Sequence, residues 1–217
     1  MRVGVLGSGL MGSKLGTILA QAGHEVVFSY SRDIKKLERM AKDAGKKASA
    51  GTPAEAARGA DAVLLAVHWS RVRDVLAEAG GMSGKLLMSC MLPMSKDDSR
   101  LVVGHTISGA EMLAKKVKRA HVVSAFSTVP SEVLFAVFDQ RKKKERPDLV
   151  YCGDNKGAKK TAARLIRDVG FNPVDVGELS MARYIEPYSL RMAQRAYESD
   201  DGPAIAYRFA RFKERGR

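Results

Sequence analysis

The chain opens with a short apolar segment, Val3 to Leu6, followed at once by the run Gly7-Ser8-Gly9-Leu10-Met11-Gly12. This run is a G-x-G-x-x-G turn between a predicted strand and a predicted helix. Gly7 permits the tight turn, Gly9 lets a ligand approach the backbone, and Gly12 lets helix and strand pack closely. Any tight strand-to-helix turn uses glycine, but the position and spacing favour a dinucleotide site whose pyrophosphate meets the free N–H groups of the helix.

Apolar segments alternate with amphipathic ones along most of the remaining chain. Strands are expected at Val26–Phe28, Ala62–Val67, Leu86–Met91, Val122–Phe126, Leu149–Cys152 and Pro173–Val176, and helices after Gly9, over 33–44 and over about 156–169. Strands and helices in this order predict an α/β fold, a Rossmann-type doubly wound parallel sheet. We expect residues 1–178 to form the dinucleotide-binding domain.

Residues 179–217 are expected to form a C-terminal helical tail that packs on this domain or on a partner subunit. A first helix has Met181, Ile185 and Met192 on one face, and a last helix is marked by Ile205, Phe209 and Phe212 after a break at Asp200–Pro203. Six of the fourteen aromatic residues lie between Tyr184 and Phe212. They either pack the tail onto the sheet or line a ligand cleft or subunit interface.

The end of the second strand indicates which dinucleotide binds. An NAD site usually has Asp or Glu here to accept from the ribose 2′-hydroxyl. This chain has Ser31 and Arg32 instead, and Lys36 follows one helical turn later. A 2′-phosphate favours such donors, while Asp33 is better explained by the start of the next helix. We therefore predict NADP(H) rather than NAD.

Two further loops should reach the carboxyl edge of the sheet, beside the nicotinamide. The first carries Val67, His68 and Trp69, and the second carries Met91, Leu92 and Pro93. Trp69 either walls the cofactor or is a surface-packed indole. His68 has no carboxylate partner nearby in sequence, so an acid–base role is not favoured.

Composition narrows the possible partners. The net charge of +13 is spread over the chain, apart from Arg141-Lys142-Lys143-Lys144, which is interpreted as a solvated loop. Zinc-finger spacing and aromatic–basic interleaving are absent from the sequence, so no nucleic-acid partner is expected. No apolar run is long enough to span a membrane, and the N-terminus is interpreted as a strand rather than a signal peptide. Cys90 and Cys152 are expected to be reduced core thiols in a cytoplasmic protein.

The chain resembles the NADPH-dependent reductases of the deazaflavin coenzyme F-420, with the N-terminal reductase domain of the STEAP metalloreductases as a relative. The resemblance is carried by the glycine turn, Ser31-Arg32, Ala66–Trp69, VVSAFSTVP (122–130) and the segment from Val150 to Pro187. It covers essentially residues 1–190. Residues 94–100, 134–146 and 202–217 depart from the family pattern and could shape the pocket for the second substrate.

The resemblance implies hydride transfer between NADPH and a deazaflavin or flavin ring stacked on the nicotinamide. Carried over by position, Ser8 to Met11 would hold the pyrophosphate and Ser31, Arg32 and Lys36 the 2′-phosphate, while Thr128, Val129 and Pro130 would line the hydride-transfer crevice. The reacting atoms belong to cofactor and substrate, so no catalytic side chain and no metal ligand is expected. A homodimer through residues 180–215 is expected.

Two other functions stay open. The chain could be an NADPH-dependent flavin or ferric reductase on the same scaffold, or a non-enzymatic NADP(H)-sensing protein that has lost the second site. A β-hydroxyacid dehydrogenase is disfavoured, because those enzymes carry a large helical domain after the dinucleotide domain and only a short tail follows here. The physiological hydride acceptor and the reaction direction are open at this point.

Overall fold

A computed structural model describes residues 1–212 and shows a central β-sheet. Its strand order is β3-β2-β1-β4-β5-β6-β7-β8. The strands are β1 (Arg2–Leu6), β2 (Glu25–Ser29), β3 (Ala48–Ala50), β4 (Ala62–Leu65), β5 (Leu86–Ser89), β6 (His121–Ser124), β7 (Asp148–Gly153) and β8 (Asn172–Asp175). β1 to β6 are paired in parallel, which confirms the doubly wound α/β fold.

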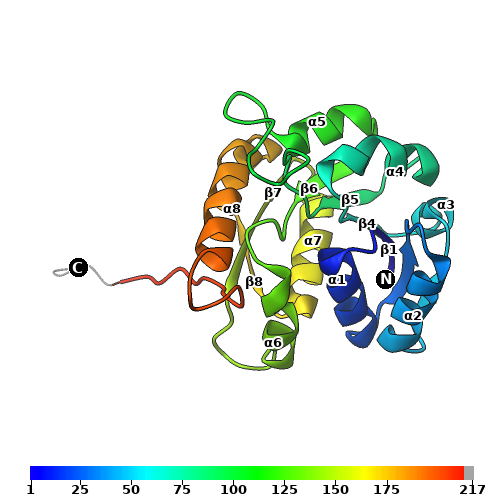
Figure 1. The fold of residues 1–217 in the computed structure, drawn as a ribbon, viewed down its shortest axis with the longest axis horizontal. Helices are drawn as coiled ribbons and strands as arrows, with labels where there is room; N and C mark the ends of the chain where they lie inside the picture. Colours follow the sequence, from blue (N-terminus) through cyan, green and yellow to red (C-terminus); the bar gives the residue numbers. More distant parts are fainter. Residues whose placement is uncertain (213–217) are drawn as a thin grey trace.

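Helices cover both faces of this sheet (Figure 1). They are α1 (Leu10–Gln21), α2 (Ile34–Ala44), α3 (Pro53–Ala57), α4 (Val72–Ala79), α5 (Gly109–Lys116), α6 (Leu134–Asp139), α7 (Lys156–Val169) and α8 (Ala182–Tyr197), with short 3-10 turns η1 (Trp69–Arg71), η2 (Ser131–Val133) and η3 (Leu179–Met181). Buried side chains of α1, α2, α6 and α7 form one core layer. Those of α3, α4, α5 and the start of α8 form the other.

Strand side chains alternate between these two layers because successive residues of a strand point to opposite faces. In β4, Ala62 and Leu64 belong to the first layer, whereas Val63 and Leu65 belong to the second. All four are buried. This explains why the central strands are continuous apolar runs, as a sheet covered on both faces requires.

Two features of the C-terminal half differ from the sequence predictions. β7 pairs with β6 in the antiparallel direction, so the sheet is mostly rather than wholly parallel. The predicted last helix around Ile205, Phe209 and Phe212 is wrong, since residues 203–212 are not helical. The main-chain N–H of Asp148 donates to Tyr207 O at 2.8 Å, and this antiparallel bridge holds the segment extended beside β7.

Other sequence predictions can be checked against this fold. Cys90 and Cys152 are buried free thiols, and burial raises the pKa of each to about 12. The basic run lies in a loop between α6 and β7, as predicted, where the Arg141 guanidinium stacks 3.8 Å from the Phe138 ring centroid. No helix within residues 1–212 is both long and apolar enough to span a bilayer.

Candidate functional site

The turn between β1 and α1 has the geometry that its glycines predict. Gly7 has φ of +130°, and a Cβ there would lie 2.2 Å from the carbonyl oxygen of Ala66. A Cβ on Gly12 would lie 2.2 Å from Gly7 O, so helix and turn touch backbone to backbone. A Cβ on Gly9, in contrast, would meet no atom within 4 Å.

The N-terminus of α1 is therefore open toward this space. Gly9 is its N-cap residue and provides no side-chain hydrogen bond, and the first turn holds no acidic residue. The first N–H groups of a helix lack internal partners and carry partial positive charge. This arrangement is suited to an anion such as a pyrophosphate.

A cleft of about 520 Å³ lies beside the end of β2, and we call it the arginine cleft. It is lined by Ser8, Tyr30, Ser31, Arg32, Arg71, Asp74 and Glu78. Ser8 Oγ donates to Tyr30 O at 3.3 Å, which joins the glycine turn to the β2 end. Asp33 caps α2 by accepting from Lys35 N at 2.9 Å and does not line the cleft, which supports the helix-start interpretation of this acid.

Two predicted phosphate ligands, Ser31 and Arg32, thus lie together, while the third does not line the cleft. Lys36 is exposed on α2 outside the lining. Sequence reasoning missed Arg71, which reaches the same cleft from η1 after β4. Arg71 could have been identified from its position two residues after Trp69. That turn follows the carboxyl end of a central strand, where ligand-binding residues are expected.

A second cleft, of about 290 Å³, lies at the carboxyl ends of β4, β5 and β6, and we call it the carboxyl-edge cleft. Its lining includes the predicted residues Gly9, Leu10, Met11, Val67, His68, Met91 and Leu92, together with Met94, Asp98 and Ser127. Trp69 and Pro93 do not line it. Trp69 packs against the second core layer, as the surface-packed interpretation of the indole expects, and the Pro93 ring is buried near Gly109.

His68 has a carboxylate partner that its sequence neighbours did not reveal. Its Nε2 lies 3.2 Å from Asp98 Oδ1 and 3.1 Å from Ser95 O. Its Nδ1 accepts from Ser70 N at 3.2 Å. Because Nδ1 is an acceptor, Nε2 carries the proton and holds the 94–101 loop against the carboxyl-edge cleft.

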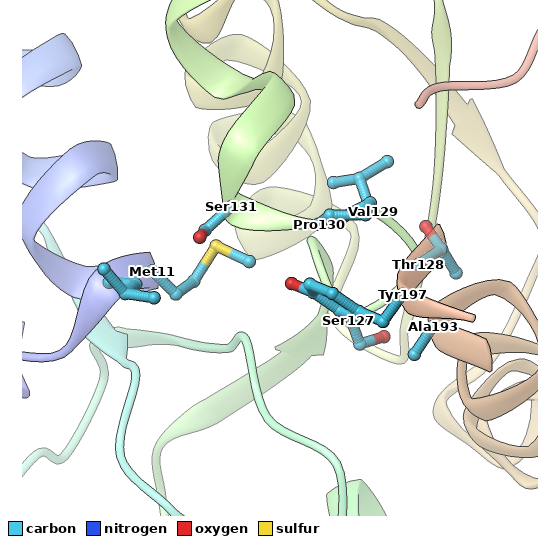
Figure 2. Close-up of a pocket in the computed structure, with 9 residues that line it drawn as sticks. Met11, Ser127, Thr128, Val129, Pro130, Ser131, Ala193 and Tyr197 are labelled. Carbon is cyan, nitrogen blue, oxygen red and sulfur yellow. The ribbon is translucent and has the colours of Figure 1, made fainter. Parts of the chain in front are cut away.

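The third cleft, of about 240 Å³, lies between α1, the loop 127–131 and α8, and we call it the α8 cleft. It is lined by Leu10, Met11, Ser127, Thr128, Val129, Pro130, Ser131, Ala193 and Tyr197. Figure 2 shows Tyr197 reaching from α8 with its hydroxyl end toward Met11 and Ser131. Leu10, Met11 and Ser127 also line the carboxyl-edge cleft, so the two clefts are contiguous.

The predicted crevice residues Thr128, Val129 and Pro130 all line this cleft, but they lie deeper than the sequence suggested. Val129 is only 4% exposed and belongs to the first core layer. Thr128 Oγ1 is hydrogen-bonded to the Tyr207 hydroxyl at 2.8 Å. A bulky residue at position 129 would therefore disrupt the core as well as any ligand.

Residues from the C-terminal region complete the α8 cleft, and sequence reasoning did not single them out. Tyr197 donates from its hydroxyl to Glu132 Oε2 at 2.9 Å. Partial desolvation of the hydroxyl and its bond to Glu132 raise the pKa of Tyr197 to about 12. The cluster of aromatic residues after Tyr184 was the available signal. Tyr207 packs the tail against β7 and Tyr197 lines a cleft, while a role of the cluster in binding a ligand or a partner subunit stays a prediction.

Within residues 1–212, no group of three or more His, Cys, Asp or Glu side chains is placed to hold a metal ion.

The chain is similar in sequence to known proteins. Residues 2–93 match the sequence model of a family described as "NADP oxidoreductase coenzyme F420-dependent". The chain is 29% identical to metalloreductase STEAP3 of Rattus norvegicus over 191 residues, which is 88% of this chain and 37% of that protein. The chain therefore spans little more than a third of that curated relative.

Two solved structures have a similar fold. A protein of Arthrobacter sp. FB24, provisionally described as an F420-dependent NADP-reductase, superposes with a TM-score of 0.84 at 23% identity, covering 97% of this chain and 100% of its own. A hypothetical protein of Sinorhizobium meliloti superposes with a TM-score of 0.75 at 26% identity, covering 84% and 88%. These findings confirm the predicted resemblance: residues 2–93 match the model of the F420-dependent NADP oxidoreductase family, and the chain is similar in sequence to a STEAP metalloreductase.

Proposed function

We propose that this protein binds NADPH along the carboxyl edge of its sheet and transfers hydride to a deazaflavin or flavin ring in the α8 cleft. The observation that carries the proposal is the continuity of two clefts, which share Leu10, Met11 and Ser127. Hydride transfer needs the donor and acceptor rings in contact. Ligands that fill two contiguous clefts meet this requirement.

The residues present fit the phosphates of NADPH. The space in front of Gly9 is open, and the uncapped α1 N-terminus faces it, so Ser8 to Met11 would hold the pyrophosphate. Ser31, Arg32 and Arg71 would hold the 2′-phosphate in the arginine cleft. Guanidinium groups bind phosphate through charge-assisted hydrogen bonds, which favour NADPH over NADH.

NADPH, when bound, supplies a hydride from its nicotinamide. The chain contributes alignment and exclusion of water. Val67, Met91 and Leu92 give the carboxyl-edge cleft an apolar wall, and the His68–Asp98 pair holds the 94–101 loop against it. The acceptor takes the hydride together with one proton from solvent, so the products are NADP⁺ and the reduced acceptor.

The α8 cleft is suited to a planar ring. Leu10, Met11, Pro130 and Ala193 provide apolar surface, and Tyr197 adds an aromatic side chain at its mouth. An isoalloxazine or deazaflavin ring offers large apolar faces that such a lining can cover. The alternatives, a reductase of ferric chelates acting through flavin and an NADP(H) sensor, use the same NADPH site and differ in what enters this cleft.

An acceptor panel tests the proposal. NADPH oxidation is measured with F-420, FMN, FAD and a ferric chelate. Turnover with F-420 or a free flavin is expected. Turnover of the ferric chelate only when flavin is added would favour the ferric reductase. NADPH binding by fluorescence titration without turnover of any acceptor would favour the sensor and overturn the proposed reductase.

Ala193→Trp tests the place of the acceptor. Ala193 lines the α8 cleft but not the carboxyl-edge cleft. An indole there should fill the acceptor space, so activity with every acceptor is lost while the Kd of NADPH stays within about twofold. Gln194→Trp is the matched control, because Gln194 is the next residue on α8, is exposed, and lines neither cleft. Full activity of Ala193→Trp would show that the acceptor does not bind in the α8 cleft.

A further inference from the structure

Three hydroxyl groups of the C-terminal region hold the loop 127–132, which forms one wall of the α8 cleft. Ser189 Oγ is hydrogen-bonded to Ser127 Oγ at 3.2 Å. The Tyr207 hydroxyl is hydrogen-bonded to Thr128 Oγ1 at 2.8 Å, and that of Tyr197 donates to Glu132 at 2.9 Å. These contacts join segments 62 to 79 residues apart in sequence.

Tyr207 is held by contacts to both the sheet and α8. Its hydroxyl also accepts from the main-chain N–H of Val150 in β7 at 3.1 Å. Its ring packs edge-to-face against Tyr188 of α8 and against Phe209. Since Thr128 is 2% exposed, this hydroxyl is its buried hydrogen-bonding partner. Tyr207 thus ties the cleft wall to both the sheet and α8.

The Tyr197 contact spans the mouth of the cleft. The side chain projects from the last turn of α8 toward Met11 and Ser131 (Figure 2). Its hydroxyl donates to Glu132 in η2. Glu132 Oε2 also accepts from Ser131 Oγ at 3.2 Å, and Ser131 Oγ accepts from Lys14 Nζ of α1 at 3.4 Å. The chain Lys14–Ser131–Glu132–Tyr197 therefore connects α1 to α8 across one end of the cleft.

We propose that the C-terminal region determines which hydride acceptor fits, with Tyr197 as a specificity-determining residue and Tyr207 as a positioning residue that acts through Thr128. This inference rests on the proposed function, because it assumes that the acceptor occupies the α8 cleft. The three contacts fix the separation of α8 from the loop 127–132. They therefore fix the width of the α8 cleft, which admits a flat ring and excludes bulkier acceptors.

The test compares variants that lose one hydroxyl each. Tyr197→Phe keeps the ring and loses the bond to Glu132, whereas Thr128→Val keeps the side-chain shape and loses the bond to Tyr207. Each loss should raise the KM of F-420 or FMN roughly three- to tenfold, as expected for one hydrogen bond. The value of kcat should change less, because ground-state and transition-state binding lose the same contact.

A binding measurement gives a readout independent of turnover. FMN and F-420 are fluorescent, and each is titrated into protein saturated with NADP⁺. Their Kd should rise by the same factor as KM, while the Kd of NADPH stays unchanged. Thr128→Ser keeps a hydroxyl and should restore acceptor binding.

Tyr184→Phe is the matched control for Tyr197→Phe. Tyr184 lies on the same helix, is 68% exposed, and lines none of the three clefts. Loss of its hydroxyl should leave the acceptor KM and Kd unchanged. Thermal unfolding of every variant separates loss of the fold from loss of the acceptor site.

The outcomes are distinguishable. Raised acceptor KM and Kd with unchanged NADPH affinity, restored by Thr128→Ser, support the inference. Unchanged acceptor KM and Kd in both Tyr197→Phe and Thr128→Val overturn it and leave the proposed function standing. If the unmodified protein neither binds nor reduces any acceptor, the proposed function fails and the inference fails with it.

Discussion

Arg32 and Arg71 approach one cleft from turns that follow different strands, β2 and β4. Asp74 and Glu78 line the same cleft, and Asp74 Oδ2 lies 3.6 Å from an Arg71 guanidinium nitrogen. Arg71 is therefore partly neutralised by its neighbour in this structure. Arg32 has no carboxylate partner within salt-bridge distance among residues 1–212. Its charge is the one most available to a phosphate.

Arg32→Ala should remove most of the preference for NADPH over NADH. A hydrogen bond to a charged group contributes roughly 1.5–3 kcal/mol, which corresponds to about ten- to a hundredfold in the Kd of NADPH. NADH lacks the 2′-phosphate, so its Kd should hardly change. Fluorescence titration with both nucleotides measures the effect.

Lys36→Ala provides the comparison for Arg32→Ala. Lys36 was predicted from sequence to bind the same phosphate, but its side chain lies outside the arginine cleft. We expect a smaller rise in the NADPH Kd, within about threefold. Equal affinity of the unmodified protein for NADPH and NADH would contradict the assignment of the whole cleft.

At the level of elements, α8 is attached to α5 by a buried carboxylate. Glu186 of α8 is 2% exposed, and its two oxygens accept from the backbone N–H groups of Gly109 and Ala110 at 2.8 and 3.0 Å. Beside it, Arg183 forms two hydrogen bonds with Glu111, whose pKa is lowered to about 2 chiefly by this contact. The residues 94–101 that close the carboxyl-edge cleft lie just before α5.

The attachment should make stability depend on pH. Burial raises the pKa of Glu186 to about 7, despite the two N–H donors that favour the charged form, and the negative charge of Glu111 adds to the rise. In the unfolded chain the pKa is near its ordinary value of 4.5. The folded state therefore binds this proton more tightly, so the residue's contribution to the unfolding free energy falls as pH rises from about 4.5 to about 7.

Glu186→Gln removes this titration while keeping one acceptor oxygen. Relative to this variant, the unmodified protein should lose up to roughly 3 kcal/mol of unfolding free energy between pH 4.5 and pH 7.5. Urea unfolding at a series of pH values measures the difference. Parallel pH profiles for the two proteins would show that Glu186 does not titrate in this range.

Sequence patterns predicted elements well where one physical cause dominates. The segments Val3–Leu6 and Ala62–Leu65 are apolar because both faces of the sheet are buried there. Gly7 and Gly12 are required because backbone atoms approach them too closely for a side chain. The last helix around Phe209 was not predictable, because a bridge to Asp148 overrides helical spacing.

The candidate site was predicted less completely than the fold. His68 and Asp98 are thirty residues apart in sequence, and only the folded chain brings them together. Arg71 and Tyr197 were missed for the same reason. Residues adjacent to the glycine turn and to strand ends were found, because the topology of a doubly wound sheet fixes where such positions lie.

At the scale of the whole molecule, aromatic side chains remain exposed on the C-terminal side, where α8 and the following segment lie at the opposite end from α2 and α3 (Figure 1). They are Tyr184, Tyr188, Tyr197, Phe209 and Phe212, with Phe212 91% exposed. Exposed aromatic groups gathered on one side of a molecule mark interaction surfaces more often than scattered single residues do.

We therefore predict a homodimer that buries this side, within the span 180–215 expected from the sequence. Burial in the partner would remove from water most of the roughly 150–250 Å² of the Phe212 side chain, which is 91% exposed, and about half as much for Phe209, which is 58% exposed. Summed over two copies, this is a sizeable part of a standard interface. Size-exclusion chromatography with light scattering at micromolar concentration should give about twice the chain mass of 23.6 kDa. The double variant Phe209→Asp, Phe212→Asp should run as a monomer, since two carboxylates cannot be desolvated there without partners. Ile34→Asp, at an exposed apolar residue on α2 at the far end, is the control and should stay dimeric. A monomeric unmodified protein would contradict the prediction.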